Sequence, residues 1–145
     1  MIGIVVISHG TFCEGLLDTM QMLIGDGYGV KAVPLFPGET VDVYRDKLRQ
    51  TLKESDQGDG VMVLADIKAG TPYQSAAYLA KEFKMALVSG MNLPMLLSVT
   101  LELTEEDTLE TLVERATEKD SFCIEGMVCG KGERKQRAKL SINKN

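Results

Sequence analysis

Two kinds of hydrophobic pattern alternate along the chain. Continuous apolar runs, rich in β-branched residues, are typical of strands buried on both faces of a parallel sheet. Such runs lie at residues 2–7, 30–35, 61–65 and 85–89. Between them, apolar residues recur every three or four positions and predict amphipathic helices. These helices are expected over residues 12–24, 41–52, 72–83 and 109–116, with a further apolar stretch from Pro94.

Strands that alternate with helices predict an α/β fold, a three-layer sandwich around a mostly parallel sheet. The common doubly wound arrangement has the strand order 2-1-3-4, which places the first and third strands side by side. Residues 121–128 are predicted as a final strand. Apolar periodicity ends at Gly130, so we expect one domain over residues 1–129 and a basic C-terminal tail or linker over residues 130–145.

Charge and composition exclude several classes of function. The net charge of the 145 residues is −5, but the tail carries +5 and residues 1–129 therefore carry −10. An acidic body repels phosphate backbones, so no nucleic acid is expected as a partner. No apolar run approaches the roughly 20 residues that a membrane span needs, so no direct membrane insertion is expected. Three widely spaced cysteines predict no disulfide framework and favour the cytoplasm.

His9 is the only histidine of the chain. Centres that need two or more histidines therefore cannot be built within one chain, and the cysteines offer no C-x-x-C pair for zinc. We expect no metal site and no cofactor.

Two helix starts follow the first and third predicted strands. Thr11 and Glu14, directly after His9, have the spacing of a capping box. After the third strand, Thr71 is expected as the cap, with Pro72 at the first helical position and Gln74 at the third.

His9 and Asp66 end these two neighbouring strands, where the carboxyl edge of a doubly wound sheet opens into a crevice. A carboxylate on one ring nitrogen fixes the tautomer of an imidazole and leaves the other nitrogen free as a nucleophile. Free N–H groups at helix N-termini favour anions. The predicted chemistry is a phosphohistidine, with His9 and Asp66 as catalytic residues. The phosphate-binding candidates are Gly10, Thr11, Gly70 and Thr71.

Four motifs in order resemble one family. They are Ser8-His-Gly10, Leu35-Phe-Pro-Gly-Glu39, Leu64-Ala-Asp-Ile-Lys-Ala-Gly-Thr-Pro72 and Gly90-Met-Asn-Leu-Pro-Met-Leu96. Together they are similar to the enzyme IIA component of the mannose/fructose/sorbose family of the bacterial phosphoenolpyruvate:sugar phosphotransferase system. The chain departs from the family at Ala69, where a second glycine is more common.

The resemblance implies a phosphotransferase component with flavodoxin-like winding. It implies that His9 accepts a phosphoryl group from the histidine-containing phosphocarrier protein and passes it to a histidine of a IIB component for sugar uptake. It further implies a homodimer whose last strand is antiparallel and exchanged between subunits, and a cytoplasmic protein that works beside a membrane sugar permease.

Two alternatives stay open from the sequence. One is the phosphoryl-donor subunit of a dihydroxyacetone kinase system, which shares the fold and the histidine. The other is a non-catalytic, anion-binding regulatory module in which His9 is never phosphorylated. The sequence names neither the sugar nor the ring nitrogen that carries the phosphate, and it does not say whether a IIB domain is fused or separate.

Overall fold

Four parallel strands form the central sheet, in the order β2-β1-β3-β4. They are β1 (Gly3–His9), β2 (Lys31–Leu35), β3 (Val61–Ala65) and β4 (Met85–Ser89). β1 is an inner strand, which pairs with β2 on one side and with β3 on the other. The computed structural model describes residues 1–131 and 137–138 of the chain. The predicted strand order is confirmed.

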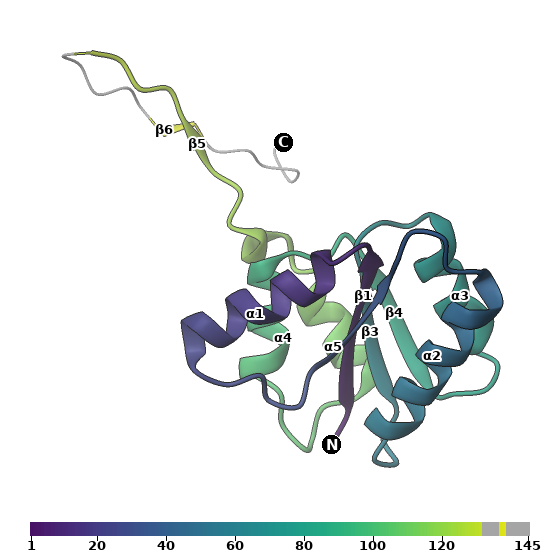
Figure 1. The fold of residues 1–145 in the computed structure, drawn as a ribbon. Helices are drawn as coiled ribbons and strands as arrows, with labels where there is room; N and C mark the ends of the chain where they lie inside the picture. Colours follow the sequence, from purple (N-terminus) through teal and green to yellow (C-terminus); the bar gives the residue numbers. More distant parts are fainter. Residues whose placement is uncertain (132–136, 139–145) are drawn as a thin grey trace.

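Helices cover both faces of this sheet, as Figure 1 shows. One face carries α1 (Phe12–Ile24), α4 (Leu93–Leu101) and α5 (Leu109–Ala116), and the other carries α2 (Val41–Ser55) and α3 (Gly70–Leu79). Alternate residues of β1 serve the two cores: Ile4 and Val6 face the α1 side, whereas Val5 and Ile7 face the α2 side. The three-layer sandwich is therefore confirmed, and both faces of the sheet are buried, as the continuous apolar runs predict.

The end of the domain differs from the prediction. The strand expected over residues 121–128 is instead a short 3-10 helix, η1 (Lys119–Phe122), followed by a two-residue strand, β5 (Gly126–Met127). The hydroxyl and the amide of Ser121 both donate to the carbonyl of Glu118, at 2.6 and 3.1 Å, and these bonds close η1. β5 does not join the main sheet; it pairs antiparallel with β6 (Arg137–Ala138) in a separate two-stranded sheet.

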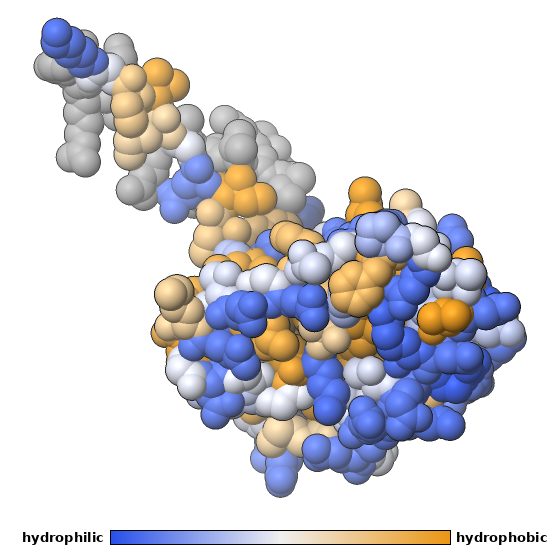
Figure 2. Space-filling view, in the orientation of Figure 1, coloured by the Kyte–Doolittle hydropathy of each residue, from blue (hydrophilic) through white to orange (hydrophobic). Residues whose placement is uncertain are grey.

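Residues 123–131 form a segment that leaves the sandwich, which we call the C-terminal arm (Figure 1). Ile124, Met127 and Val128 are exposed along it, and Figure 2 shows apolar side chains on this segment. The β5–β6 pair joins residues on both sides of the predicted boundary at Gly130. Residues 132–136 and 139–145 of the predicted tail lie outside the described residues, so the division into 1–129 and 130–145 stays a prediction.

β4 is an edge of the main sheet. Among the described strands it pairs with β3 alone, so the backbone groups on its outer side have no described partner strand. Across residues 1–131 and 137–138, no helix combines the length and the apolar character that crossing a bilayer requires.

Candidate functional site

His9 and Asp66 meet at the carboxyl edge of the sheet. His9 is the last residue of β1, and Asp66 directly follows β3, which pairs with β1 up to Ile7 and Ala65. His9 Nδ1 lies 2.9 Å from Asp66 Oδ2, and the backbone N–H of His9 donates to the same oxygen at 3.0 Å. The other carboxylate oxygen accepts the N–H of Ile67 at 2.9 Å. Asp66 is thus fixed by three hydrogen bonds, as the adjacent strands predict.

The contact with Asp66 selects one tautomer of His9. An ionised carboxylate only accepts hydrogen bonds, so Nδ1 carries the ring proton and Nε2 keeps its lone pair; this assignment is made from the hydrogen-bond partner. The His9 side chain is 48% exposed, whereas that of Asp66 is 15% exposed. Nε2 therefore belongs to a ring that is nearly half exposed, and the carboxylate that orients this ring is mostly shielded from water.

Gly70 lies against the His9 ring. A Cβ added at this position would overlap Nε2 and lie 2.8 Å from Cε1. The φ of Gly70 is +80°, a conformation that L residues rarely adopt. Both the backbone conformation and the close approach to the ring therefore require glycine. The departure at Ala69 from the more common glycine pair leaves this essential glycine in place.

Helix α3 starts earlier than the sequence predicts. It begins at Gly70 after Ala69, whose backbone is extended, and its N-terminus has no side-chain cap hydrogen bond. The predicted capping box is therefore wrong: Thr71 is the second residue of the helix and Pro72 the third. The conformational freedom of Gly70 permits this early start. The first N–H groups of a helix have no partner within it, and those of Gly70 and Thr71 are at the start of α3, where Gly70 lies against the His9 ring.

The start of α1 also differs from its predicted capping box, because Thr11 makes no side-chain cap hydrogen bond. The buried hydroxyl of Ser8 performs that role instead: it accepts the N–H of Cys13 at 2.8 Å and donates to the carbonyl of Gly10 at 3.0 Å. Gly10 has a φ of +57° and turns the chain back over Ser8. Its N–H donates to the carbonyl of Leu35 at 2.7 Å, so this predicted phosphate-binding amide is occupied here.

Comparison with known proteins places this geometry in a family. The family model described as "PTS system fructose IIA component" matches residues 3–117. The chain belongs to this family. The match covers the whole sandwich from β1 to α5, including both strand ends of the site.

Curated relatives of this IIA component carry related names. The fructose-specific EIIA component of Bacillus subtilis is 36% identical over 127 residues, which is 86% of each chain. The mannose-specific EIIAB component of Escherichia coli K12 is 30% identical over 118 residues, which is 81% of this chain but 36% of that protein. The chain thus spans about a third of that longer relative.

Solved structures show the same fold. The mannose/sorbose-specific IIA subunit from Enterococcus faecalis superposes with a TM-score of 0.73 at 26% identity, covering 80% of this chain and 86% of that one. The EIIA component from Streptococcus agalactiae gives a TM-score of 0.72 at 26% identity, covering 80% and 89%. The α/β architecture is therefore that of phosphotransferase-system IIA proteins.

Cys13 lies in the first turn of α1, four residues after His9, and is fully buried in this IIA component. Burial raises the pKa of the Cys13 thiol, so the thiol stays protonated at neutral pH and is a poor nucleophile. In residues 1–131 and 137–138, no group of three His, Cys, Asp or Glu side chains is placed to hold a metal ion. Between Cys13 and His9, the exposed ring of His9 is therefore the better candidate nucleophile.

Sequence reasoning missed two features near His9. One is Ser8, whose signal is a small hydroxyl residue at the buried end of a strand, two positions before a glycine. The other is an ion pair between Glu39, in the turn after β2, and Lys47 of α2, whose oxygen and nitrogen lie 2.9 Å apart. Eight residues separate these two, so no local spacing rule points to them.

Proposed function

We propose that this IIA component carries a phosphoryl group on Nε2 of His9, receives it from the histidine-containing phosphocarrier protein and passes it to a IIB component for sugar uptake. The observation that carries the proposal is the position of Asp66. Its carboxylate holds Nδ1 at 2.9 Å, which leaves Nε2 as the free nitrogen of a ring that is nearly half exposed. Family membership supports the general role in sugar phosphotransfer.

The proposed transfer needs no cofactor, because every bond, electron pair and proton is accounted for by the two histidine rings and the phosphoryl group. The lone pair of His9 Nε2 attacks phosphorus and forms a new N–P bond, while the N–P bond of the donor phosphohistidine breaks. The electron pair of the broken bond returns to the donor's ring nitrogen. The proton on His9 Nδ1 stays in place, and the positive charge that develops on the ring is stabilised by the Asp66 carboxylate. The same steps in reverse pass the group to a histidine of the IIB component.

The two turns beside His9 are proposed to bind the phosphoryl oxygens. The N–H groups of Gly70 and Thr71 lie at the start of α3, where the helix dipole favours an anion by about 0.3–1 kcal/mol. The Thr71 hydroxyl is a further donor. Gly10 and Thr11, at the start of α1, form the opposite side of the proposed phosphate site, with the Gly10 amide becoming a ligand only if its bond to Leu35 opens.

A homodimer is proposed to complete the sheet. The outer side of β4 has no described partner strand, and the C-terminal arm carries exposed apolar residues. An antiparallel strand from the arm of a second copy would satisfy both features by pairing with β4. The assembly would work in the cytoplasm beside a membrane sugar permease.

Phosphorylation of the full chain tests the proposed function. The protein is incubated with phosphoenolpyruvate, enzyme I and the phosphocarrier protein, and acid-labile, base-stable phosphate is measured. We expect one phosphate per chain in the wild type and none in His9→Ala, since no second histidine exists to replace it. Absence of phosphate from the folded wild type would instead support a non-catalytic, anion-binding module.

A further inference from the structure

The turn after β2 closes on itself. Residues 36–40 connect β2 to α2, and within this turn the N–H of Glu39 donates to the carbonyl of Phe36 at 3.1 Å. The N–H of Phe36 donates in return to the Glu39 side chain, at 2.9 Å from Oε1. The Glu39 carboxylate therefore fixes the backbone N–H of Phe36, and the Glu39 N–H fixes the Phe36 carbonyl.

Lys47 of α2 stabilises this turn through several contacts. Its Nζ donates to the carbonyl of Pro34 at 2.7 Å and to both Glu39 oxygens, at 2.9 and 3.2 Å. The same ammonium lies 4.8 Å from the centre of the Phe36 ring, within range of a cation–π contact. The Lys47 hydrogen bond also holds the pKa of Glu39 below its ordinary value. One lysine thus ties together β2, the turn and the Phe36 ring.

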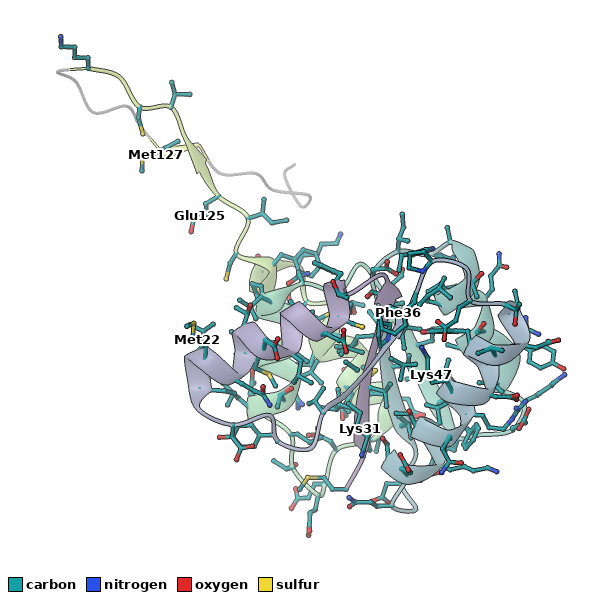
Figure 3. All side chains as sticks on the ribbon, viewed as in Figure 1. Met22, Lys31, Phe36, Lys47, Glu125 and Met127 are labelled. Atoms are coloured by element: carbon teal, nitrogen blue, oxygen red, sulfur yellow. The ribbon has the colours of Figure 1, made fainter. Side chains whose placement is uncertain are left out.

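The turn after β2 is hydrogen-bonded, through Leu35, to the backbone next to His9. His9 is opposite Leu35 in the β1–β2 register, and Gly10 N–H donates to the Leu35 carbonyl at 2.7 Å. Phe36 is the next residue, and Figure 3 shows it near the tip of β1. Adjacent strands lie about 4.8 Å apart, so the Phe36 backbone is one strand spacing from the Gly10 turn. The conformation of the turn therefore sets where Phe36 lies relative to His9.

Three large apolar side chains are exposed at this edge of the sheet. Phe36 is 44% exposed, Phe12 is 51% exposed and Ile67 is 55% exposed. Each lies one to three residues after the end of one of the adjacent strands β2, β1 and β3, so their backbones share the edge of the sheet that carries His9. A single exposed apolar residue is ordinary, but a group of them around an exposed nucleophile marks an interaction surface.

We propose that the Lys47–Glu39 pair is a positioning device that holds Phe36 as a contact for the protein phosphoryl donor. The occupant is the phosphohistidine-bearing carrier protein, and the inference rests on the proposed function. A protein donor must lay its own surface around His9 for its N–P bond to break and the new N–P bond to form at Nε2. Because Lys47 is paired with Glu39, the turn presents the Phe36 ring rather than a free charge to that surface.

The test compares a protein donor with a small one. His9 of the full chain is phosphorylated either by the phosphorylated carrier protein or by phosphoramidate, a small donor that also transfers from a P–N bond. The variants are Phe36→Ala, Lys47→Met and Lys47→Arg. Lys31→Met is the matched control, because it makes the same substitution at the opposite end of β2 (Figure 3).

For Phe36→Ala and Lys47→Met we expect about a tenfold rise in KM for the carrier protein, a maximal rate within twofold of wild type, and an unchanged rate with phosphoramidate. Lys47→Arg should recover most of the loss, and Lys31→Met should match wild type. A variant that combines Phe36→Ala with Lys47→Met should raise KM no more than the worse of the two single substitutions, since Lys47 acts through Phe36.

Three results would overturn the proposal. One is an unchanged KM for the carrier protein in Phe36→Ala, a surface substitution that leaves the Lys47–Glu39 pair intact. A second is an equal loss with both donors, which would mean a general disturbance of His9. A third is a wild type that accepts phosphate from neither donor. This result would contradict the proposed function itself, so the wild type is measured before any variant.

Discussion

The two turns that meet at His9 use their polar groups differently. In the β1–α1 turn, Ser8 caps the helix and the Gly10 amide is bonded to Leu35, so these groups are satisfied within the protein. In the β3–α3 turn, Asp66 holds the ring and α3 begins at Gly70 without a side-chain cap. The first turn therefore satisfies its polar groups within the protein, whereas the second orients the His9 ring and has no side-chain cap at the start of α3, where we propose that the phosphoryl group binds. This difference assigns separate tasks to the two loops.

Asp66→Asn should give the largest loss. The substitution keeps the shape of the side chain but removes the charge that stabilises the developing positive ring. Such a charge in a preorganised site is worth roughly 2–4 kcal/mol, which corresponds to a fall in transfer rate of about 30- to 800-fold. The measurement is the rate of His9 phosphorylation, with Asp18→Asn on the exposed side of α1 as the control. An unchanged rate would leave Asp66 only a structural role.

Gly70→Ala should slow transfer by about 100-fold, because a new methyl group would overlap Nε2 and displace the ring. The substitution also strains a backbone with positive φ, by roughly 1–2 kcal/mol. Gly25→Ala separates these effects, since Gly25 has nearly the same φ and no atom near its added Cβ. Both variants should lose stability, but only Gly70→Ala should lose the rate. Equal rates in the two folded variants would show that contact with the ring is unimportant.

Substitutions of Thr71, in the second turn, should have a smaller effect on the rate. Thr71→Val should lose roughly 1.5–3 kcal/mol of stabilisation if the hydroxyl donates to the phosphoryl group, a fall of about 10- to 150-fold in rate, whereas Thr71→Ser should retain it. Because Thr71 is not the N-cap of α3, the valine variant loses no cap, and thermal stability should stay near that of wild type. Equal rates for valine and serine would remove the hydroxyl from the phosphate site.

Ser8→Ala should have the smallest effect on chemistry and a clear effect on stability. It removes the cap of α1, worth about 1 kcal/mol, and should lower Tm by about 3 °C. The rate in the folded variant should fall by only a few fold, because Asp66 still holds the ring. Thermal unfolding and the phosphorylation rate are measured on the same sample. A large loss of rate without a change in Tm would contradict this prediction, because it would give Ser8 a part in the transfer itself.

The sequence predicts the sandwich, its strand order and the meeting of His9 with Asp66, because buried parallel strands and strand ends leave strong local patterns. It places the start of α1 correctly but assigns its cap bond to the wrong side chain, and it misplaces the start of α3. Thr11 is the N-cap residue of α1, but the Ser8 hydroxyl accepts the capping bond from Cys13. In α3 the positive φ of Gly70 lets the helix begin after Ala69, before Thr71. It also misses the Lys47–Glu39 pair, which depends on how α2 packs against its own turn. Such contacts are tertiary and leave no short-range pattern.

Locating the phosphate on the ring tests the central claim most directly. The full chain, labelled with ¹⁵N, is phosphorylated by the carrier protein, and the imidazole nitrogens are observed by NMR; the single histidine gives one set of ring signals. We predict phosphate on Nε2 of His9, with Nδ1 still protonated and bonded to Asp66. Phosphate on Nδ1, or no phosphohistidine in the folded wild type, would contradict the account.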